Sequence, residues 1–185
     1  QEALEISRHR LNLYLDCKKV NPKKLAEEIV SVGMAGQVVV YGSTELAAEI
    51  RSTAGDTVAV MIKWRPEFGF TDWIDTHTPD AVEVDAMDVN PDAVRKFHAR
   101  GIWVQAKVLG KDDHPETWLR MVEAGVNWLQ TDLPEEVLGQ CLWRSMRPRP
   151  VGLAVHRGTV RYAPENTMPA FQKAIRLGAD FAECD

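Results

Sequence analysis

Charged side chains gather at the ends of short apolar runs that recur along this sequence. Glu183 and Asp185 stand two residues apart in one such run, and Asp16 and Lys18 do the same in another. In an extended strand, residues two apart point to the same face, so each pair shares a face. The run ends carry Asp16-Cys17-Lys18, Lys63-Trp64, Glu83-Val84-Asp85, Lys107, Thr131-Asp132, His156-Arg157-Gly158 and Glu183-Cys184-Asp185.

Two carboxylates directed toward one place repel each other unless a cation or a proton lies between them. Oxygen ligands such as those of Glu183 and Asp185 suit Mg²⁺ or Ca²⁺ rather than zinc. The three cysteines, Cys17, Cys141 and Cys184, have no C-x-x-C spacing. Neither a zinc site nor a disulfide framework is therefore expected.

The apolar runs have the spacing of strands that alternate with helices. They start 20 to 28 residues apart, which suits a strand, a turn, a helix and a return loop. Eight such runs predict an α/β fold, a (β/α)8 TIM barrel whose functional residues gather at the carboxyl ends of its strands. An open doubly wound sheet is the alternative, but no G-x-G-x-x-G or P-loop follows the early runs. The runs are 11–18, 37–42, 57–64, 81–86, 101–108, 126–132, 151–158 and 179–185.

Start and stop signals mark the helices between these runs. Asn21 and Asn90 each precede a proline, which predicts a capping side chain followed by a first-turn proline. Gly101 is placed to end the second of these helices, and Thr167 to cap a later one. His114-Pro115 and Leu133-Pro134 open predicted helices over 116–124 and 135–146.

Composition limits the classes of protein that the chain can represent. With 185 residues, 45% of them hydrophobic, one globular domain over 1–185 is expected, a minimal barrel. A net charge of −5 gives no general attraction to nucleic acid or to an anionic membrane. The longest apolar run, 58–62, is far short of the roughly 20 residues that span a bilayer. No signal peptide is expected, which leaves the cytoplasm, the periplasm and secretion open.

The residues from His156 onward form one ordered pattern. H-R-G at 156–158 is followed by P-E-N-T at 164–167, A-F at 170–171 and G-A-D-x-x-E-x-D at 178–185. This pattern closely resembles the opening of the glycerophosphodiester phosphodiesterase family. More weakly, residues 13–18 resemble the third-strand L-x-x-E-x-K of that family, with Asp16 in place of Glu. Residues 125–134, with their T-D-x-P, resemble its last strand.

The order of these motifs differs from that of the family, in which H-R-G comes first and T-D-x-P last. Here T-D-x-P precedes H-R-G, so the chain matches family strands three to eight followed by strands one and two. This order implies either a circular permutant or a slice through two tandem domains. Because a barrel closes on itself, we expect the run 179–185 to pair in parallel with the run 11–18.

The resemblance implies metal-dependent hydrolysis of glycerophosphodiesters to glycerol 3-phosphate and an alcohol. It implies that Glu183, Asp185 and Asp16 hold one divalent cation, Mg²⁺ or Ca²⁺. It also implies that His156 is a catalytic acid–base group and that Arg157 clamps the phosphate. An imidazole exchanges protons near neutral pH, and a guanidinium offers planar hydrogen bonds to phosphate oxygens.

Further strand-end residues complete the expected site. Lys18 is placed to add positive charge beside the phosphate, and we group it with the catalytic residues. Lys63 and Trp64 are candidate substrate-binding residues, although a solvated lysine and a packed tryptophan are the alternatives. Glu83 and Asp85 form either a second acidic pair or a structural pair inside the barrel.

One departure from the family affects the expected activity. The family carries a second histidine, in an H-D motif, on an insertion between its second and third strands. His9, His77, His98 and His114 do not match that motif. The alternative function is therefore a catalytically weak or silent phosphate-binding barrel. A third alternative is a module completed by a tandem domain or by a second copy in a homo-oligomer. In each case the expected ligand is a small molecule, with no nucleic acid and no membrane span.

Overall fold

The computed structural model describes residues 2–143 and 152–184. The chain divides into two compact units. The N-terminal unit comprises Gln1–Lys107 and Gly125–Trp128, and the C-terminal unit comprises Val108–Ala124 and Leu129–Asp185. The single domain expected over residues 1–185 stays a prediction.

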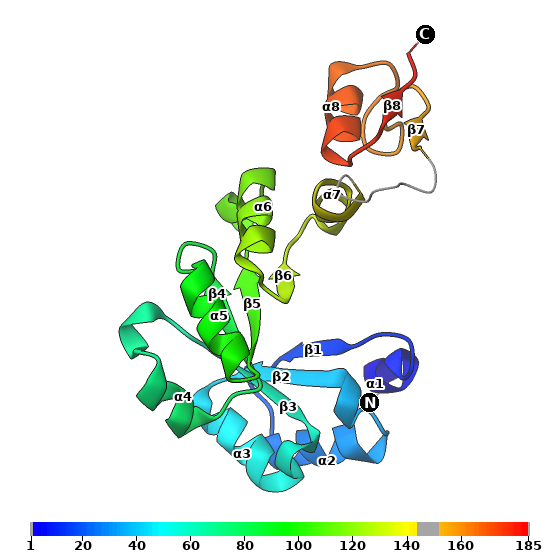
Figure 1. The fold of residues 1–185 in the computed structure, drawn as a ribbon. Coiled ribbons are helices and arrows are strands. Elements are labelled where there is room, and N and C mark those ends of the chain that lie inside the picture. The colour runs from blue at the N-terminus through cyan, green and yellow to red at the C-terminus, as the bar shows by residue number, and fades with distance from the viewer. Residues whose placement is uncertain (1, 144–151, 185) are drawn as a thin grey trace. The chain divides into compact units, whose positions relative to one another are not determined.

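A parallel sheet organises the N-terminal unit (Figure 1). Its strands are neighbours in chain order, and β1 to β5 pair in parallel, from Leu13↔Val38 to Asp85↔Lys107. Consecutive parallel strands joined by helices are the arrangement of a (β/α)8 barrel, so the α/β, TIM-barrel-like fold class is confirmed. The strands are β1 (Leu13–Asp16), β2 (Val38–Gly42), β3 (Ala59–Lys63), β4 (Ala81–Asp85), β5 (Trp103–Lys107) and β6 (Trp128–Gln130).

The helices of this unit begin where the capping signals placed them. The Asn21 and Asn90 side chains accept hydrogen bonds from the backbone N–H groups of Lys24 and Ala93, each at 2.9 Å. Gly101, at φ 72°, follows the end of its helix. The elements are α1 (Glu2–Ser7), α2 (Pro22–Ser31), η1 (Ala35–Gln37), α3 (Thr44–Ala54), η2 (Gly55–Thr57), η3 (Pro66–Phe68), α4 (Thr71–His77) and α5 (Pro91–Ala99).

The core of the N-terminal unit lies between the sheet and its helices. Ile29 on α2 and Ile50 on α3 pack on the strand residues Val40, Val60 and Ile62, and all five are at most 1% exposed. Strand β4 is buried from Ala81 to Val84, as expected of a parallel strand covered on both faces. This packing fixes the strands whose carboxyl ends carry the polar residues.

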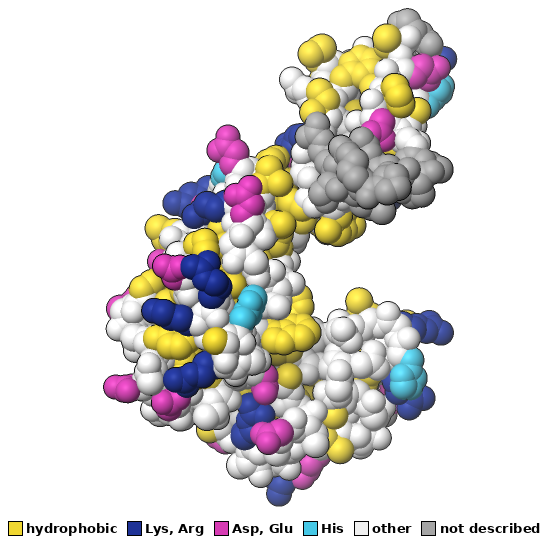
Figure 2. Space-filling view, viewed as in Figure 1, with side chains coloured by type: hydrophobic (Ala, Val, Ile, Leu, Met, Phe, Trp, Pro, Cys, Tyr) yellow, Lys and Arg dark blue, Asp and Glu magenta, His cyan; other side chains and the backbone are white. Residues whose placement is uncertain are grey.

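The C-terminal unit contains a second, smaller sheet. Strands β7 (Ala154–Val155) and β8 (Phe181–Ala182) pair in parallel, and α8 (Met168–Arg176) connects them. The remaining elements are η4 (Gly110–Asp112), α6 (Pro115–Ala124), α7 (Pro134–Val137) and the π-helical turn η5 (Leu138–Trp143). Figure 2 shows apolar side chains on the surface of the segment that carries α8 and β8, where Met168, Ile175 and Phe181 are over 60% exposed.

Two details differ from the sequence predictions. Thr167 occupies the N-cap position of α8, but its hydroxyl donates to the Pro164 carbonyl at 2.7 Å instead of capping the helix. The helix predicted over 135–146 is α only as far as Val137 and continues as η5. Each of the eight predicted runs contains a strand. The pairing of run 11–18 with run 179–185, and hence the permuted order, stays a prediction because those runs lie in different units.

No helix formed by the described residues is long and apolar enough to cross a membrane.

Candidate functional site

The H-R-G motif forms a sharp turn directly after β7. Arg157 and Gly158 both have positive φ, 51° and 79°. Gly158 is required here because a Cβ atom at this position would lie 2.8 Å from the Ala170 Cβ of α8. The carbonyl of Arg157 accepts the Asn166 N–H at 3.0 Å, which ties the P-E-N-T segment to the turn.

This turn brings the charged groups of the motif into pairs. The His156 Nε2 atom lies 3.5 Å from the Glu183 carboxylate at the end of β8. The Arg157 guanidinium donates to Glu165 at 3.0 Å, so Glu165 braces the loop. The His156 and Glu183 side chains are 68% and 52% exposed, which leaves both accessible to a ligand.

Asp16 is the last residue of β1, and Lys18 lies in the bend that follows the strand. Their side chains form an exposed ion pair at 3.3 Å. Between them, the pKa of the Cys17 thiol is raised by burial and further by the nearby Asp16 carboxylate. Asp16 thus belongs to the N-terminal unit, whereas Glu183 belongs to the C-terminal unit.

A second polar cluster lies on one face of the sheet in the N-terminal unit, around Glu83. The Glu83 carboxylate is 2% exposed and accepts hydrogen bonds from four strands. The donors are Tyr41 Oη at 3.0 Å, Lys63 Nζ at 3.0 Å, Tyr14 Oη at 3.4 Å and Gln105 Nε2 at 3.5 Å. These contacts satisfy a buried charge that would otherwise be costly.

The electrostatics of this cluster favour protonated tyrosines. Burial raises the pKa of both Tyr14 and Tyr41 far above the ordinary value, and the negative charge of Glu83 raises them further. Both hydroxyls therefore remain hydrogen-bond donors at neutral pH. The structural interpretation of Glu83, as a packed residue inside the sheet, fits these contacts.

Lys63 links the buried and the accessible parts of the cluster. Its Nζ atom also contacts Asp85 at 2.5 Å, and the Asp85 side chain is 37% exposed. Trp64, by contrast, is 5% exposed, donates from Nε1 to the Gly69 carbonyl and packs edge-on against Phe97. Substrate binding by Lys63 and Trp64 stays a prediction, and the packing of Trp64 gives it a role in the core.

The T-D-x-P segment is held by an aspartate that the sequence analysis did not single out. Asp113, 8% exposed, accepts hydrogen bonds from Thr131 Oγ1 at 2.7 Å, Trp118 Nε1 at 2.7 Å and the Asp132 N–H at 2.8 Å. Asp113 follows η4 in the loop after β5. Its position in a polar loop carries no signal for the contact with the T-D-x-P segment, because Thr131 and Asp132 lie 18 and 19 residues away.

The proposed metal ligands are chemically suited to a hard divalent cation, since all three are carboxylates. Asp16 and Glu183 are exposed; Asp16 lies 3.3 Å from the Lys18 ammonium, and Glu183 lies 3.5 Å from His156 Nε2. Asp185 lies outside the described residues. Among the described residues, no group of three or more His, Cys, Asp or Glu side chains could hold a metal ion.

The other histidines are engaged away from the H-R-G turn. His98 pairs with Asn127 at 2.9 Å, and His114 with Thr117 at 3.0 Å. The His77 ring packs edge-on against Trp73. None of these contacts involves a residue of the 156–183 segment.

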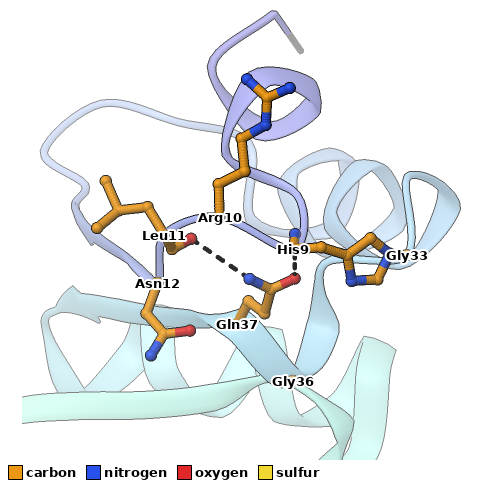
Figure 3. Close-up of a pocket in the computed structure, with 7 residues that line it drawn as sticks. All are labelled: His9, Arg10, Leu11, Asn12, Gly33, Gly36 and Gln37. Atoms are coloured by element: carbon orange, nitrogen blue, oxygen red, sulfur yellow. Dashed lines mark hydrogen bonds between the residues drawn. The ribbon is translucent and has the colours of Figure 1, made fainter.

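The fourth, His9, lines a cavity of about 730 Å³ beside the amino ends of β1 and β2 (Figure 3). The Gln37 side chain accepts the His9 N–H at 2.9 Å and donates to the Leu11 carbonyl at 3.5 Å. Figure 3 shows the Arg10 side chain directed away from Gln37. The functional groups of a barrel lie at the opposite, carboxyl ends of the strands, so this cavity is not the candidate site.

The segment that contains the H-R-G motif matches a known protein family. The glycerophosphoryl diester phosphodiesterase family model matches residues 156–185, the segment that forms the H-R-G turn, α8 and β8. The chain matches no curated protein sequence. Recognition of this family signature from the sequence is thereby confirmed.

The fold of the chain is similar to that of solved phosphodiesterase structures. A glycerophosphoryl diester phosphodiesterase from Parabacteroides distasonis ATCC 8503 has a TM-score of 0.62 and 20% identity, over 74% of this chain and 52% of that one. A glycerophosphodiester phosphodiesterase from Agrobacterium tumefaciens str. C58 has a TM-score of 0.58 and 17% identity, over 71% and 56%. The chain thus spans little more than half the length of these structures and shares their fold.

Proposed function

We propose that the protein hydrolyses glycerophosphodiesters to glycerol 3-phosphate and an alcohol. The observation that carries this proposal is the family match over 156–185, in a segment that folds to bring His156 within 3.5 Å of Glu183. A histidine and a carboxylate thus meet at the two strand ends of one βαβ unit. The fold shared with phosphodiesterases supports the same conclusion.

The residues of this chain would divide the chemistry among them. Arg157 and Lys18 bind the oxygens of the phosphodiester, Arg157 through a planar fork and Lys18 as a point charge. A hydroxyl of the substrate's glycerol attacks phosphorus while its proton is removed, which forms a cyclic phosphate. The oxygen of the alcohol group leaves phosphorus as it gains a proton. His156 supplies one of these proton transfers at Nε2. Water then opens the cyclic phosphate to give glycerol 3-phosphate.

A divalent cation completes the proposal. Glu183, Asp185 and Asp16 would hold one Mg²⁺ or Ca²⁺ through carboxylate oxygens. When bound, the ion neutralises a phosphodiester oxygen and polarises phosphorus. Glu183 would then exchange its contact with His156 for the ion, leaving the imidazole free to act on the substrate.

The engagement of the other histidines favours a second candidate, a phosphate-binding barrel with little or no turnover. His98, His114 and His77 each contact neighbours outside the 156–183 segment, and none matches the second family histidine. One acid–base group would then be lacking. Such a protein would still bind glycerol phosphate through Arg157.

Turnover of glycerophosphocholine separates the two candidates. The 185-residue chain is assayed with Mg²⁺ or Ca²⁺, with and without chelator, beside His156→Ala and the control His98→Ala. Metal-dependent release of glycerol 3-phosphate that His156→Ala abolishes and His98→Ala retains supports hydrolysis. Phosphate binding without turnover in the unmodified chain supports the silent barrel. Neither turnover nor binding would contradict both.

A further inference from the structure

The H-R-G turn is exposed except at one place. From residue 152 to residue 169, the buried positions are Gly158 and Thr159. Thr159 is 7% exposed, whereas His156 and the residues that follow Val160 extend into solvent or are partly covered. A buried hydroxyl in an otherwise exposed loop needs a hydrogen-bond partner, and the identity of that partner shows what holds the loop.

The partner is the helix that follows. Thr159 Oγ1 donates to the Ala170 carbonyl in the first turns of α8 at 3.0 Å, in a buried contact. The same residue, Ala170, is 0% exposed and lies against the Gly158 backbone, where no Cβ would fit. The turn is thus seated on α8 by close packing at Gly158 and by one side-chain hydrogen bond at Thr159.

Thr159 also organises the loop on its other side. Its carbonyl accepts the Tyr162 N–H at 2.8 Å and the Ala163 N–H at 3.2 Å. These bonds turn the chain back so that Glu165 reaches the Arg157 guanidinium and the Asn166 N–H reaches the Arg157 carbonyl. Thr159 therefore connects α8 to the loop that brings Glu165 to Arg157.

We propose that Thr159 is a positioning residue, whose hydroxyl bond to Ala170 holds the H-R-G turn on α8 and so sets the direction of His156 and Arg157. The kinetic part of this inference rests on the proposed function. The structural part does not, because it concerns the order of the turn itself. Misplacement of reacting groups by about 1 Å can cost on the order of 10²-fold in rate, so one such bond can control turnover.

The test compares Thr159→Val, which keeps the shape and removes the donor, with Thr159→Ser, which restores it. Thr117→Val is the matched control, because Thr117 is also a buried threonine with one hydrogen bond, but on α6. Hydrogen exchange is followed at the Tyr162, Ala163 and Asn166 amides in the full chain. We expect at least a tenfold loss of protection in Thr159→Val, recovery in Thr159→Ser and no change in Thr117→Val.

Glycerophosphocholine turnover is measured on the same variants, well below their melting temperatures. We expect kcat to fall at least tenfold in Thr159→Val and to return within about threefold in Thr159→Ser. Unchanged protection in Thr159→Val, or no recovery in Thr159→Ser, overturns the inference. If the unmodified chain shows no turnover, the proposed function fails, while the exchange measurement still decides the role of Thr159. Should Thr159→Val not fold, Thr159→Ala removes the hydroxyl together with the γ-methyl group, and its comparison with Thr159→Ser isolates the hydroxyl.

Discussion

The sequence predicts only part of the environment of Glu83. Its spacing from Asp85 predicts two side chains on one face, which the structure confirms through their shared contact with Lys63. Its other partners, Tyr14 and Tyr41, come from strands 69 and 42 residues away. No local pattern announces such contacts, because they depend on the register of neighbouring strands.

The two tyrosines of this cluster give the protein a pH dependence. Burial beside Glu83 raises their pKa in the folded state, while in the unfolded chain it stays near 10. The contribution of the two tyrosines to the free energy of unfolding is therefore fully present below pH 10 and is lost as the pH rises above 10. At pH 11 the loss is at most about 1.4 kcal/mol per tyrosine, and less where solvent screens the half-buried rings.

We expect the free energy of unfolding to fall more steeply between pH 9 and 11 in the unmodified chain than in a Tyr14→Phe, Tyr41→Phe double variant. Urea unfolding measured across this range gives the difference. Tyr162→Phe is the control, because Tyr162 is 48% exposed, and it should follow the unmodified chain. Parallel curves for the unmodified chain and the double variant would contradict the prediction.

At the scale of elements, η5 and the end of α8 approach each other closely. A Cβ atom at Gly139 would lie 2.1 Å from the Leu177 carbonyl oxygen, and one at Gly178 would lie 2.5 Å from the Gly139 carbonyl oxygen. Gln140 Nε2 donates to the Ile175 and Arg176 carbonyls, each at 2.8 Å, which satisfies groups left free where α8 ends.

A buried ionic contact joins α7 to α8. The Glu136 carboxylate on α7 is 1% exposed and contacts Lys173 Nζ at 2.6 Å and Arg176 Nε at 2.5 Å on α8. Removing one partner of a buried pair is costly, whereas the intact pair mainly fixes geometry. The helix that carries the H-R-G turn is therefore held at both of its ends, by Thr159 near its start and by α7 and η5 near its end.

The close contact between Gly139 and the Leu177 backbone predicts that Gly139→Ala is destabilising by about 1–3 kcal/mol. The backbone atoms of Leu177 cannot move aside as a flexible side chain can. Thermal or urea unfolding of the full chain measures the loss. Gly36→Ala is the matched control, since a Cβ at Gly36 meets nothing within 4 Å. Equal stability of the two variants would show that η5 does not pack on α8 in this way.

The elements also show where sequence patterns succeed and where they fail. The runs contain their strands, and the Asn21 and Asn90 caps are made, because both signals are local. Thr167 bonds to Pro164 instead of capping, because a nearby carbonyl competes for its hydroxyl. The sequence analysis predicted an α-helix where η5 forms a π-helical turn, and the close approach of Gly139 to Leu177 there joins residues that are far apart in the sequence.

At the scale of the whole molecule, the H-R-G motif was predictable because its residues lie within one segment of 30 residues. The approach of Asp16 to Glu183 stays a prediction, since the two residues stand at opposite ends of the sequence and belong to different units. Their assembly depends on how the barrel closes rather than on any local signal. Metal binding is the measurement that reports this assembly.

We expect Mg²⁺ or Ca²⁺ at millimolar concentration to raise the melting temperature of the unmodified chain, since a ligand that binds the folded state stabilises it by RT ln(1 + [L]/Kd). Glu183→Ala should abolish this rise, because it removes one of the three proposed ligands. Glu67→Ala is the control, because Glu67 is an exposed glutamate that lies 3.8 Å from the Arg65 guanidinium, and this variant should keep the rise. A folded unmodified chain that shows no shift would rule out the ion site.

The lack of a match to the second family histidine sets the expected rate. One positioned acid–base group is worth roughly 10²–10⁴ in rate, so with His156 alone one proton transfer must rely on water. Arg157 and the ion would still stabilise the charge that develops on the phosphate. We therefore expect the 185-residue chain to hydrolyse glycerophosphocholine on the order of 10²–10⁴ slower than an intact relative assayed beside it.

His156→Ala should slow this hydrolysis further while leaving glycerol 3-phosphate binding largely intact, and Arg157→Ala should weaken that binding. Turnover equal to that of the relative would mean that His9, His77 or His114 reaches the substrate, and alanine variants of each would show which one.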